Sequence, residues 1–309
     1  MRIEILLSTY NGEKYLPELL DSLLGQEYED CHITARDDGS SDSTAAILKT
    51  YSEKAPEKIS VLPTGQGLGY PDCFWTLLEK APKADLYAFC DQDDVWNSRK
   101  LACCAEMCEG KMDRPLLYVH DYRICDRDLN PYGEYHMAEH GYEPGSPLGL
   151  EYFVMTSGFT MVLNEAMRER VLRDGLKGRK IEHDRWLFWC GYFGGEIVYD
   201  RRTLVDYRRH DATASQTGKS AKILLAEWWR EDVRGSRMNR WSRTARYFAD
   251  CYRDEMKEKD PGLEAQWRLV AGEKRGPGGY FGRLFFPARL KPSASGEAVL
   301  RLCFLLNRK

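Results

Sequence analysis

Three aspartates stand within four residues of one another at the end of an apolar run. Leu86 to Cys90 is a short apolar and aromatic stretch typical of a buried strand, and Asp91, Asp93 and Asp94 follow it directly. Because like charges repel, such a cluster is stable at the edge of a core only if solvent or a bound cation offsets its charge. Carboxylate oxygens are preferred ligands of hard divalent ions. The pattern predicts a divalent-metal site, with a solvated acidic loop as the alternative.

The rest of the chain predicts the elements that must position this cluster. Strands are expected at residues 3–8, 33–35, 59–62, 86–90 and 116–122, and helices at 17–26, 43–51, 72–81 and 98–108. Strands that alternate with helices through short links are typical of an α/β fold with a parallel, doubly wound sheet. Ligands of such sheets bind beyond the carboxyl ends of the strands, which is where the three aspartates fall.

The charge of the chain is unevenly distributed. Residues 219–309 contain 20 Lys and Arg residues and 11 Asp and Glu residues, a net charge of +9, although the whole chain carries −3. We therefore expect one domain at 1–215 and a basic, helical C-terminal extension at 216–309. The acidic first part shows no nucleic-acid-binding motif, so a nucleic-acid partner is not expected.

Cysteine usage and hydropathy indicate a cytoplasmic protein. Ten cysteines are present without any C-x-x-C pair, and no signal peptide precedes the expected first strand, so reduced thiols are expected. No apolar run approaches the roughly 20 residues needed to span a bilayer. Any contact with a membrane is therefore expected to be peripheral, at the inner face of the cell membrane.

The turn after the first strand excludes two common ways of binding phosphates. Residues Ser8 to Glu13 contain a single glycine, so the G-x-G-x-x-G pattern is absent, and the chain has no Walker A sequence. A glycine-rich phosphate loop is therefore not expected. A metal at the aspartate cluster is the more natural anchor for a diphosphate.

Three motifs follow successive expected strands, and together they carry a family resemblance. They are Ser8-Thr9-Tyr10-Asn11-Gly12, Asp37-Asp38-Gly39-Ser40-Ser41-Asp42 and Asp91-Gln92-Asp93-Asp94-Val95-Trp96. In this order they resemble family 2 glycosyltransferases of GT-A fold, and most closely the bacterial rhamnosyltransferase-like branch. The resemblance covers about the first 215 residues. It implies a Rossmann-like, mostly parallel sheet flanked by helices.

The resemblance also implies a role for each motif in binding the donor. Thr9 and Tyr10 would line the base pocket, and the Asp38 carboxylate would accept the imide N–H of uracil or thymine. Asp91 would contact the ribose, and Asp93 or Asp94 would bind Mn²⁺ or Mg²⁺. The alternative for Asp37 and Asp38 is turn formation and helix capping.

Two later stretches resemble segments of the same family. Glu182-His183-Asp184-Arg185-Trp186 resembles the segment with the catalytic carboxylate, which maps to Asp184. Tyr207-Arg208-Arg209-His210 resembles the segment whose histidine approaches the metal or the diphosphate. The alternatives are an ordinary carboxylate at a helix start for Asp184 and an ordinary loop histidine for His210.

A sugar or acceptor pocket is implied by residues between these segments. Gly158 matches a position near the sugar, where the absence of a side chain leaves room for the ligand. Asp121 and Trp186 are expected to contact the acceptor, with a place in the core as the alternative for Trp186. Cys73 stands where asparagine commonly precedes the phenylalanine in this branch, a departure that affects the expected donor preference.

The implied activity is an inverting, metal-dependent transfer of a sugar from a nucleotide diphosphate. The expected donor is TDP-rhamnose or a UDP-sugar, and the expected acceptor is a glycan or a lipid-linked glycan of surface polysaccharide synthesis. The extension would contact the acceptor, a membrane surface or a second copy in a homodimer, or would pack on the first domain. The rival functions are a non-catalytic module that binds a sugar nucleotide or glycan, and a sugar nucleotidyltransferase.

Overall fold

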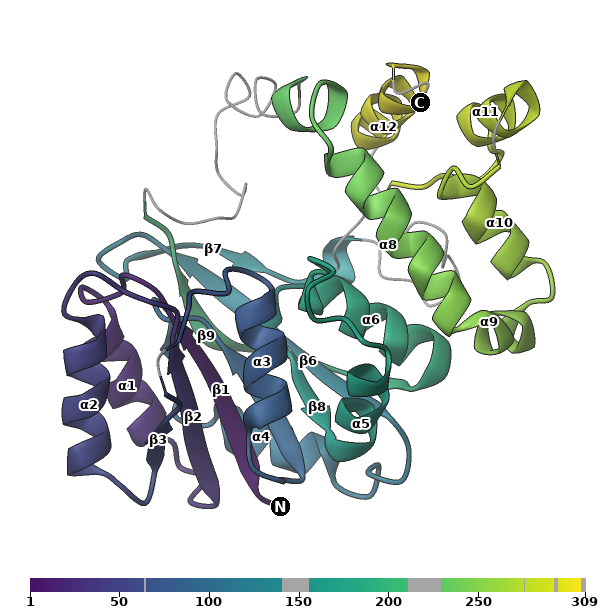
Figure 1. The fold of residues 1–309 in the computed structure, drawn as a ribbon. Helices are drawn as coiled ribbons and strands as arrows, with labels where there is room; N and C mark the ends of the chain where they lie inside the picture. Colours follow the sequence, from purple (N-terminus) through teal and green to yellow (C-terminus); the bar gives the residue numbers. More distant parts are fainter. Residues whose placement is uncertain (64, 141–155, 211–228, 275, 292–293, 307–309) are drawn as a thin grey trace. The chain divides into compact units, whose positions relative to one another are not determined.

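The computed structural model describes residues 1–309 with the exception of 64, 141–155, 211–228, 275, 292–293 and 307–309 (Figure 1). The chain divides into two compact units, residues 1–139 with 156–211 and residues 140–155 with 212–309. The expected boundary near residue 215 lies outside the described residues. Each unit is described separately below.

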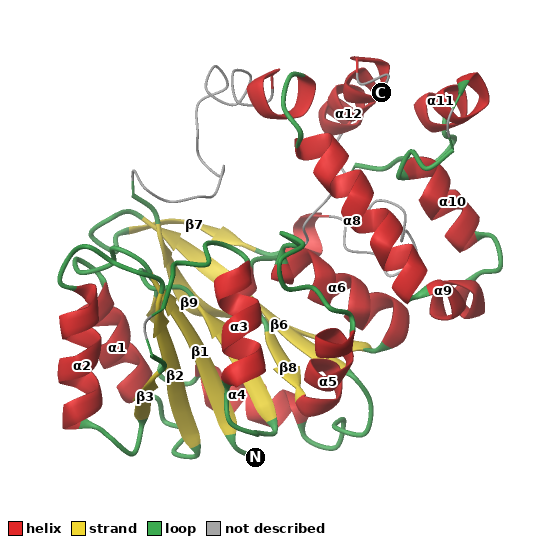
Figure 2. Cartoon of the chain, in the orientation of Figure 1, coloured by secondary structure: helices red, strands yellow, loops and turns green. Residues whose placement is uncertain are grey.

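A nine-stranded sheet forms the centre of the first unit, as Figure 2 shows in yellow. Its strands, in chain order, are β1 (Ile3–Thr9), β2 (Cys31–Asp37), β3 (Ile59–Val61), β4 (Leu86–Cys90), β5 (Val95–Trp96), β6 (Leu116–Cys125), β7 (Pro131–Tyr135), β8 (Val162–Asn164) and β9 (Glu196–Arg208). In space the order is β3-β2-β1-β4-β8-β6-β9-β5, and β7 pairs with β6.

The sheet contains both parallel and antiparallel strand pairs. β3, β2, β1 and β4 pair in parallel, while β8 runs antiparallel to both β4 and β6. β6 and β9 pair in parallel, so β9 has the same direction as β4. The carboxyl ends of β1, β2, β4 and β9 therefore share one edge. The expectation of a mostly parallel central sheet is confirmed. The antiparallel direction of β8 was not predicted, because a three-residue strand carries no sequence signal of its direction.

Helices flank this sheet as its alternating pattern requires (Figure 2). They are α1 (Leu16–Leu24), α2 (Thr44–Lys54), α3 (Asp72–Lys80), α4 (Lys100–Cys108), α5 (Glu165–Arg173) and α6 (His183–Gly194). α1 illustrates the packing: Leu16, Leu19, Leu20 and Leu23 are buried, and they recur at the spacing of one helix face. All ten cysteines are free thiols.

The second unit is helical, as expected for the C-terminal extension. Its helices are η4 (Trp229–Val233), α8 (Arg237–Cys251), α9 (Arg253–Lys259), α10 (Leu263–Val270), α11 (Pro277–Leu284) and α12 (Ala294–Leu306). Phe248 stacks on Tyr252 with ring centroids 4.3 Å apart, and Trp267 Nε1 donates to the Ala245 carbonyl at 2.9 Å. Within the described part of the chain, every helix is too short or too polar to cross a membrane.

Candidate active site

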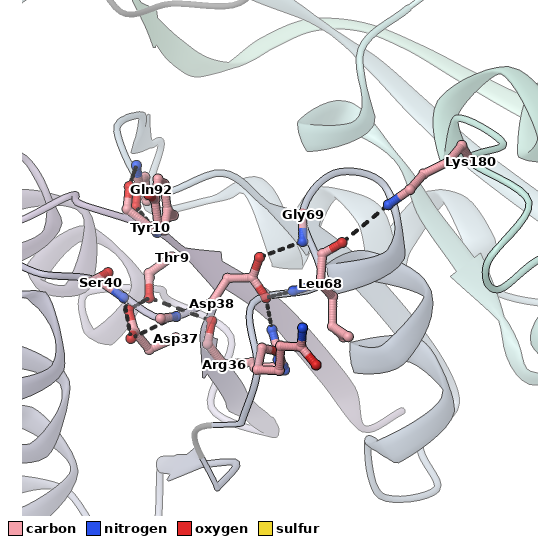
Figure 3. Close-up of polar contacts among 12 residues, drawn as sticks. Thr9, Tyr10, Arg36, Asp37, Asp38, Ser40, Leu68, Gly69, Gln92 and Lys180 are labelled. Atoms are coloured by element: carbon pink, nitrogen blue, oxygen red, sulfur yellow. Dashed lines mark hydrogen bonds and ion pairs between the residues drawn. The ribbon is translucent and has the colours of Figure 1, made fainter.

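The Asp37 carboxylate holds the turn between β2 and α2. It accepts hydrogen bonds from the Thr9 hydroxyl at 3.1 Å and from the Ser40 backbone N–H at 2.9 Å (Figure 3). Since β1 and β2 pair in parallel up to Thr9 and Asp37, these bonds fix the ends of both strands relative to each other. Asp37 therefore forms the turn, which was the alternative considered from the sequence.

The Asp38 carboxylate holds the glycine-rich loop before α3. It accepts the backbone N–H groups of Leu68 at 2.8 Å and Gly69 at 2.7 Å, and it is also hydrogen-bonded to the Arg36 guanidinium (Figure 3). Burial opposes ionisation, but the bonds from Leu68, Arg36 and Gly69 lower the pKa of Asp38 below its ordinary value. Among the described residues, the Gly69 amide is the one hydrogen-bond donor to Oδ2, so an acceptor site remains on an ionised Asp38.

Tyr10 projects into solvent from the end of β1, with 58% of the residue exposed. Its backbone is held by the side chain of Gln92, which accepts the Tyr10 N–H at 2.7 Å and donates to the Tyr10 carbonyl at 2.9 Å (Figure 3). A Cβ at Gly12 would lie 2.3 Å from Gln92 Oε1, so this approach requires glycine at position 12. Gln92 was not singled out by the sequence, although it lies between the aspartates.

The aspartates after β4 form one electrostatic group. Burial, and then the charges of Asp93 and Asp184, raise the pKa of Asp91 to about 7. Burial, Asp93 and Asp91 also raise the pKa of Asp94 well above its ordinary value. Asp94 Oδ1 accepts the Arg208 N–H at 3.1 Å, while its buried Oδ2 has no hydrogen-bond partner among the described residues. Without a bound cation, Asp91 and Asp94 therefore retain their protons at a pH where ordinary aspartates are ionised.

A buried lysine lies within electrostatic reach of this group. Lys100 is fully buried at the start of α4, where its ammonium donates to the Phe159 carbonyl at 2.7 Å and lies 3.3 Å from the centre of the Trp96 ring. Burial lowers the pKa of Lys100 to about 7, and its charge in turn favours ionised Asp91 and Asp94. Sequence reasoning missed Lys100 because helix-start lysines are usually exposed.

His210 reaches the group from the end of β9. Its Nε2 lies 2.8 Å from Asp93 Oδ2, and its ring lies against Tyr15 with centroids 4.8 Å apart. The preceding Arg208 is buried, donates to the Asp93 carbonyl at 2.9 Å and packs over the same Tyr15 ring. The structure therefore brings the segment of residues 207–210 beside the aspartates, and the approach of His210 to a metal or a diphosphate stays a prediction.

Asp184 lies in the first turn of α6 and belongs to the same electrostatic environment. Burial and the Glu182 carboxylate raise the pKa of Asp184 to about 6, although its carboxylate accepts the Arg185 N–H at 2.7 Å. Burial, and then the charges of Asp184, Glu182 and Asp91, raise the pKa of Tyr70 above its ordinary value. Burial, and to a smaller extent the charges of Asp38 and Asp91, raise the pKa of Cys73. Asp38 follows β2 and Asp91 follows β4, two strands that both run parallel to β1. The ring of His183, the residue before Asp184, lies 4.6 Å from that of Phe89 near the carboxyl end of β4, so Asp184 lies at the same edge of the sheet.

The absence of a side chain at Gly158 leaves room for the His183 ring of the same chain. A Cβ at this position would lie 2.1 Å from Nε2 of His183. The His183 ring is buried among aromatic rings, with centroids 4.5 Å from Phe74 and 4.6 Å from Phe89, and burial lowers its pKa to about 3. The sequence predicted room for a sugar at Gly158, whereas the structure fills that room with a neutral imidazole.

Asp121 and Trp186 are buried in the interior, and their expected contact with an acceptor stays a prediction. The Asp121 carboxylate accepts bonds from the Tyr199 hydroxyl at 2.8 Å, His136 Nδ1 at 2.9 Å and the Met137 N–H at 2.9 Å. Trp186 is fully buried, and its Nε1 donates to Asp174 at 2.9 Å. Both residues stabilise the fold because their polar atoms are already bound inside it.

Few of the described side chains at this edge of the sheet could ligate a metal ion. In the parts of the chain that the structure describes, no three His, Cys, Asp or Glu side chains are arranged to hold a metal ion. However, Asp93 Oδ2 and His210 Nε2 are adjacent, and Asp94 Oδ2 is buried without a partner. Mg²⁺ is usually bound by one or two carboxylates together with substrate phosphates. This donor set fits a divalent ion that is shared with a diphosphate.

The fold and the acidic edge of the sheet define a glycosyltransferase of GT-A fold. A model of the family described as "Glycosyl transferase family 2" matches residues 4–169, more than half of the chain. The chain therefore belongs to glycosyltransferase family 2, whose members use nucleotide-sugar donors. This assignment favours sugar transfer over the two rival functions considered from the sequence.

Two relatives illustrate the match in sequence. An uncharacterized glycosyltransferase of Nostoc sp. is 28% identical over 235 residues, which cover 72% of this chain and 69% of that protein. The dTDP-rhamnosyl transferase RfbG of Shigella flexneri is 33% identical over 98 residues, which cover 31% of this chain and 34% of RfbG. The match to RfbG thus spans only about a third of either protein.

Solved structures show the same fold at low sequence identity. TarS of Staphylococcus aureus, in complex with UDP-GlcNAc, has a TM-score of 0.53 at 18% identity, over 88% of this chain and 80% of that one. The mannosyltransferase PcManGT of Pyrobaculum calidifontis, in complex with GDP-Man and Mn²⁺, has a TM-score of 0.50 at 14% identity, over 99% and 86%. Identities this low show the fold alone.

Proposed function

We propose that this protein transfers a sugar with inversion from a nucleotide diphosphate, TDP-rhamnose or a UDP-sugar, to a hydroxyl of a glycan or lipid-linked glycan. The observation that supports the proposal is the position of Asp184 in the first turn of α6, directly after His183, whose ring lies 4.6 Å from that of Phe89 in β4, the strand that leads to Asp91. The dTDP-rhamnosyl transferase activity named for RfbG supports rhamnose, and the UDP-GlcNAc bound to TarS supports a uridine donor.

Two residues of this chain would bind the base of the donor. Tyr10 offers an exposed ring for stacking, held in place by Gln92. Ionised Asp38 has an acceptor site left for an imide N–H, a group that uracil and thymine both carry. A guanine donor would also present N–H groups, so we rest the choice of a pyrimidine on the resemblance and on the two relatives.

The chemical step needs one base. Asp184 would take the proton from the acceptor hydroxyl while the hydroxyl oxygen bonds to the anomeric carbon. The bond from that carbon to the diphosphate breaks, and its electron pair leaves with the diphosphate. Asp93, Asp94 and His210 would hold Mn²⁺ or Mg²⁺ there, and such an ion supplies electrostatic stabilisation of the departing diphosphate. The Mn²⁺ in the PcManGT complex supports this choice of ion.

Donor turnover with purified variants tests the proposal. Asp184→Asn should bind the donor with normal affinity and lose transfer, while Asp93→Ala should lose the metal-dependent part of donor binding. Asp30→Asn is a matched control because Asp30 is exposed just before β2, at the opposite edge of the sheet. Normal transfer by Asp184→Asn would show that another group is the base. Donor binding without transfer to any acceptor would favour a binding module instead.

A further inference from the structure

Exposed apolar side chains gather in the last two helices of the second unit and at Phe285, the residue that follows α11. They are Phe281, Phe285, Val299, Leu302, Leu305 and Leu306. Single exposed apolar residues are normal on a protein surface, but a group within about thirty residues is not. Such a group marks a surface that meets another apolar phase or partner.

α12 is apolar on both of its faces. Leu300, Cys303 and Phe304 are buried, while Val299, Leu302 and Leu306 are exposed and recur at i, i+3 and i+7. A helix that is apolar all round normally lies in a core or in contact with lipid. In the part of the second unit that the structure describes, one face of α12 is buried and the other is exposed.

α11 adds an aromatic pair, and hydrogen bonds join it to α12. The rings of Phe281 and Phe285 stack with centroids 6.1 Å apart. The Tyr280 hydroxyl donates to the Leu305 carbonyl at 3.3 Å, and the Arg301 guanidinium donates to the Leu284 and Phe286 carbonyls at 3.0 Å each. The exposed phenylalanines at α11 and the exposed apolar residues of α12 therefore belong to one pair of helices.

The same segment carries most of the positive charge of the extension. Residues 274–309 contain eight Lys and Arg residues and one Asp or Glu residue, a net charge of +7. That single acid, Glu297, is paired with Arg301 at 2.6 Å. Lys274 and Arg289 are exposed. Apolar exposure and cationic charge thus coincide in one helix pair.

We propose that the α11–α12 pair docks on an anionic lipid bilayer. The exposed phenylalanines and leucines would enter the headgroup region, and the cations would face lipid phosphates. A second copy of the chain is the less favourable occupant because it would oppose +7 with +7 across the contact. This inference does not depend on the proposed sugar transfer.

Vesicle flotation with the full chain tests the docking. The protein should float with vesicles of phosphatidylcholine and phosphatidylglycerol, and bind about tenfold or more weakly to phosphatidylcholine alone or at high salt. Equal binding to both kinds of vesicle, or none to either, would overturn the proposal.

Matched variants identify the surface. Phe281→Ser with Phe285→Ser should weaken binding to anionic vesicles about tenfold or more, and Lys274→Glu with Arg289→Glu by a similar factor. Tyr132→Ser and Lys83→Glu, exposed residues of the first unit, should bind as the wild type does. Phe281 and Phe285 are 53% and 72% exposed, so their replacement should leave the circular dichroism spectrum unchanged.

Two further results would contradict the docking. Leu302→Ser provides a second, independent apolar change on α12, and normal vesicle binding by both apolar variants would overturn the proposal. Sedimentation velocity tests whether a second copy of the chain covers this face instead of a bilayer. A dimer that the phenylalanine double variant dissociates would show that a second copy covers this face.

Discussion

Nε2 of His210 lies 2.8 Å from Oδ2 of Asp93, although the two residues are 117 positions apart in the chain. β8 is antiparallel to both β4 and β6, and β6 is parallel to β9, so β4 and β9 have the same direction. Their carboxyl ends therefore share one edge of the sheet, where Asp93 and His210 meet. The contact joins the aspartate motif of residues 91–96 to the segment of residues 207–210, and the proposed metal site depends on both.

His210→Gln should weaken Mg²⁺-dependent donor binding about tenfold to a hundredfold, whether His210 binds the ion or orients Asp93. Titration calorimetry of a nucleotide sugar with and without Mg²⁺ measures this difference. His32→Gln is the control, since His32 lies in β2 near Glu4 and Ser60. Donor binding that keeps its full metal dependence in His210→Gln would remove His210 from the site.

Transfer should be lost as the pH falls through about 6. Burial and Glu182 raise the pKa of Asp184 to that value, so the carboxylate is protonated, and unable to act as a base, at a pH where an ordinary aspartate is still ionised. Below this pKa the rate at saturating donor should fall about tenfold per pH unit. A pH profile of kcat checks this limb, and a flat profile down to about pH 4.5 would exclude Asp184 as the base.

Gly158→Ala should lower the free energy of unfolding by about 1–3 kcal/mol, because its Cβ would lie 2.1 Å from His183 Nε2 in a packed aromatic cluster. The loss should largely disappear in a His183→Ala background, where the clashing ring is gone. Gly65→Ala is the control, since a Cβ there meets nothing within 4 Å. Urea unfolding of the four proteins of this double-mutant cycle measures the coupling. An equal cost of Gly158→Ala in both backgrounds would mean that another neighbour sets the requirement for glycine.

Lys100→Met should shift Mg²⁺-dependent donor binding to higher pH. The Lys100 ammonium opposes the rise in pKa of Asp91 and Asp94, so its removal leaves these carboxyl groups protonated over a wider range. Methionine keeps an unbranched chain against Trp96. Donor affinity measured between about pH 6 and 9 should show the shift, while Lys83→Met should not. Identical pH dependence in Lys100→Met and wild type would show that the lysine acts only in packing.

The sequence determined the alternation of strands and helices in residues 1–125 and the helical extension, because hydrophobic periodicity and turn residues are local signals. It also placed the aspartates at a strand end, since strand and cluster are adjacent in the chain. The same local information left the direction of β8 undetermined. Whether a short strand pairs in parallel depends on the path of the distant residues that lead to it.

Only the tertiary structure decided what the candidate residues contact. Asp121 and Trp186 look suited to a pocket in sequence, yet partners from other elements bind their polar atoms in the interior. Lys100 bonds to the Phe159 carbonyl, 59 positions away, and Gln92 bonds to the Tyr10 backbone, 82 positions away. His183 fills the space beside Gly158, 25 positions away. Burial and long-range pairing determine the charge state and the accessibility of a side chain, and the neighbouring residues in the sequence predict neither burial nor pairing.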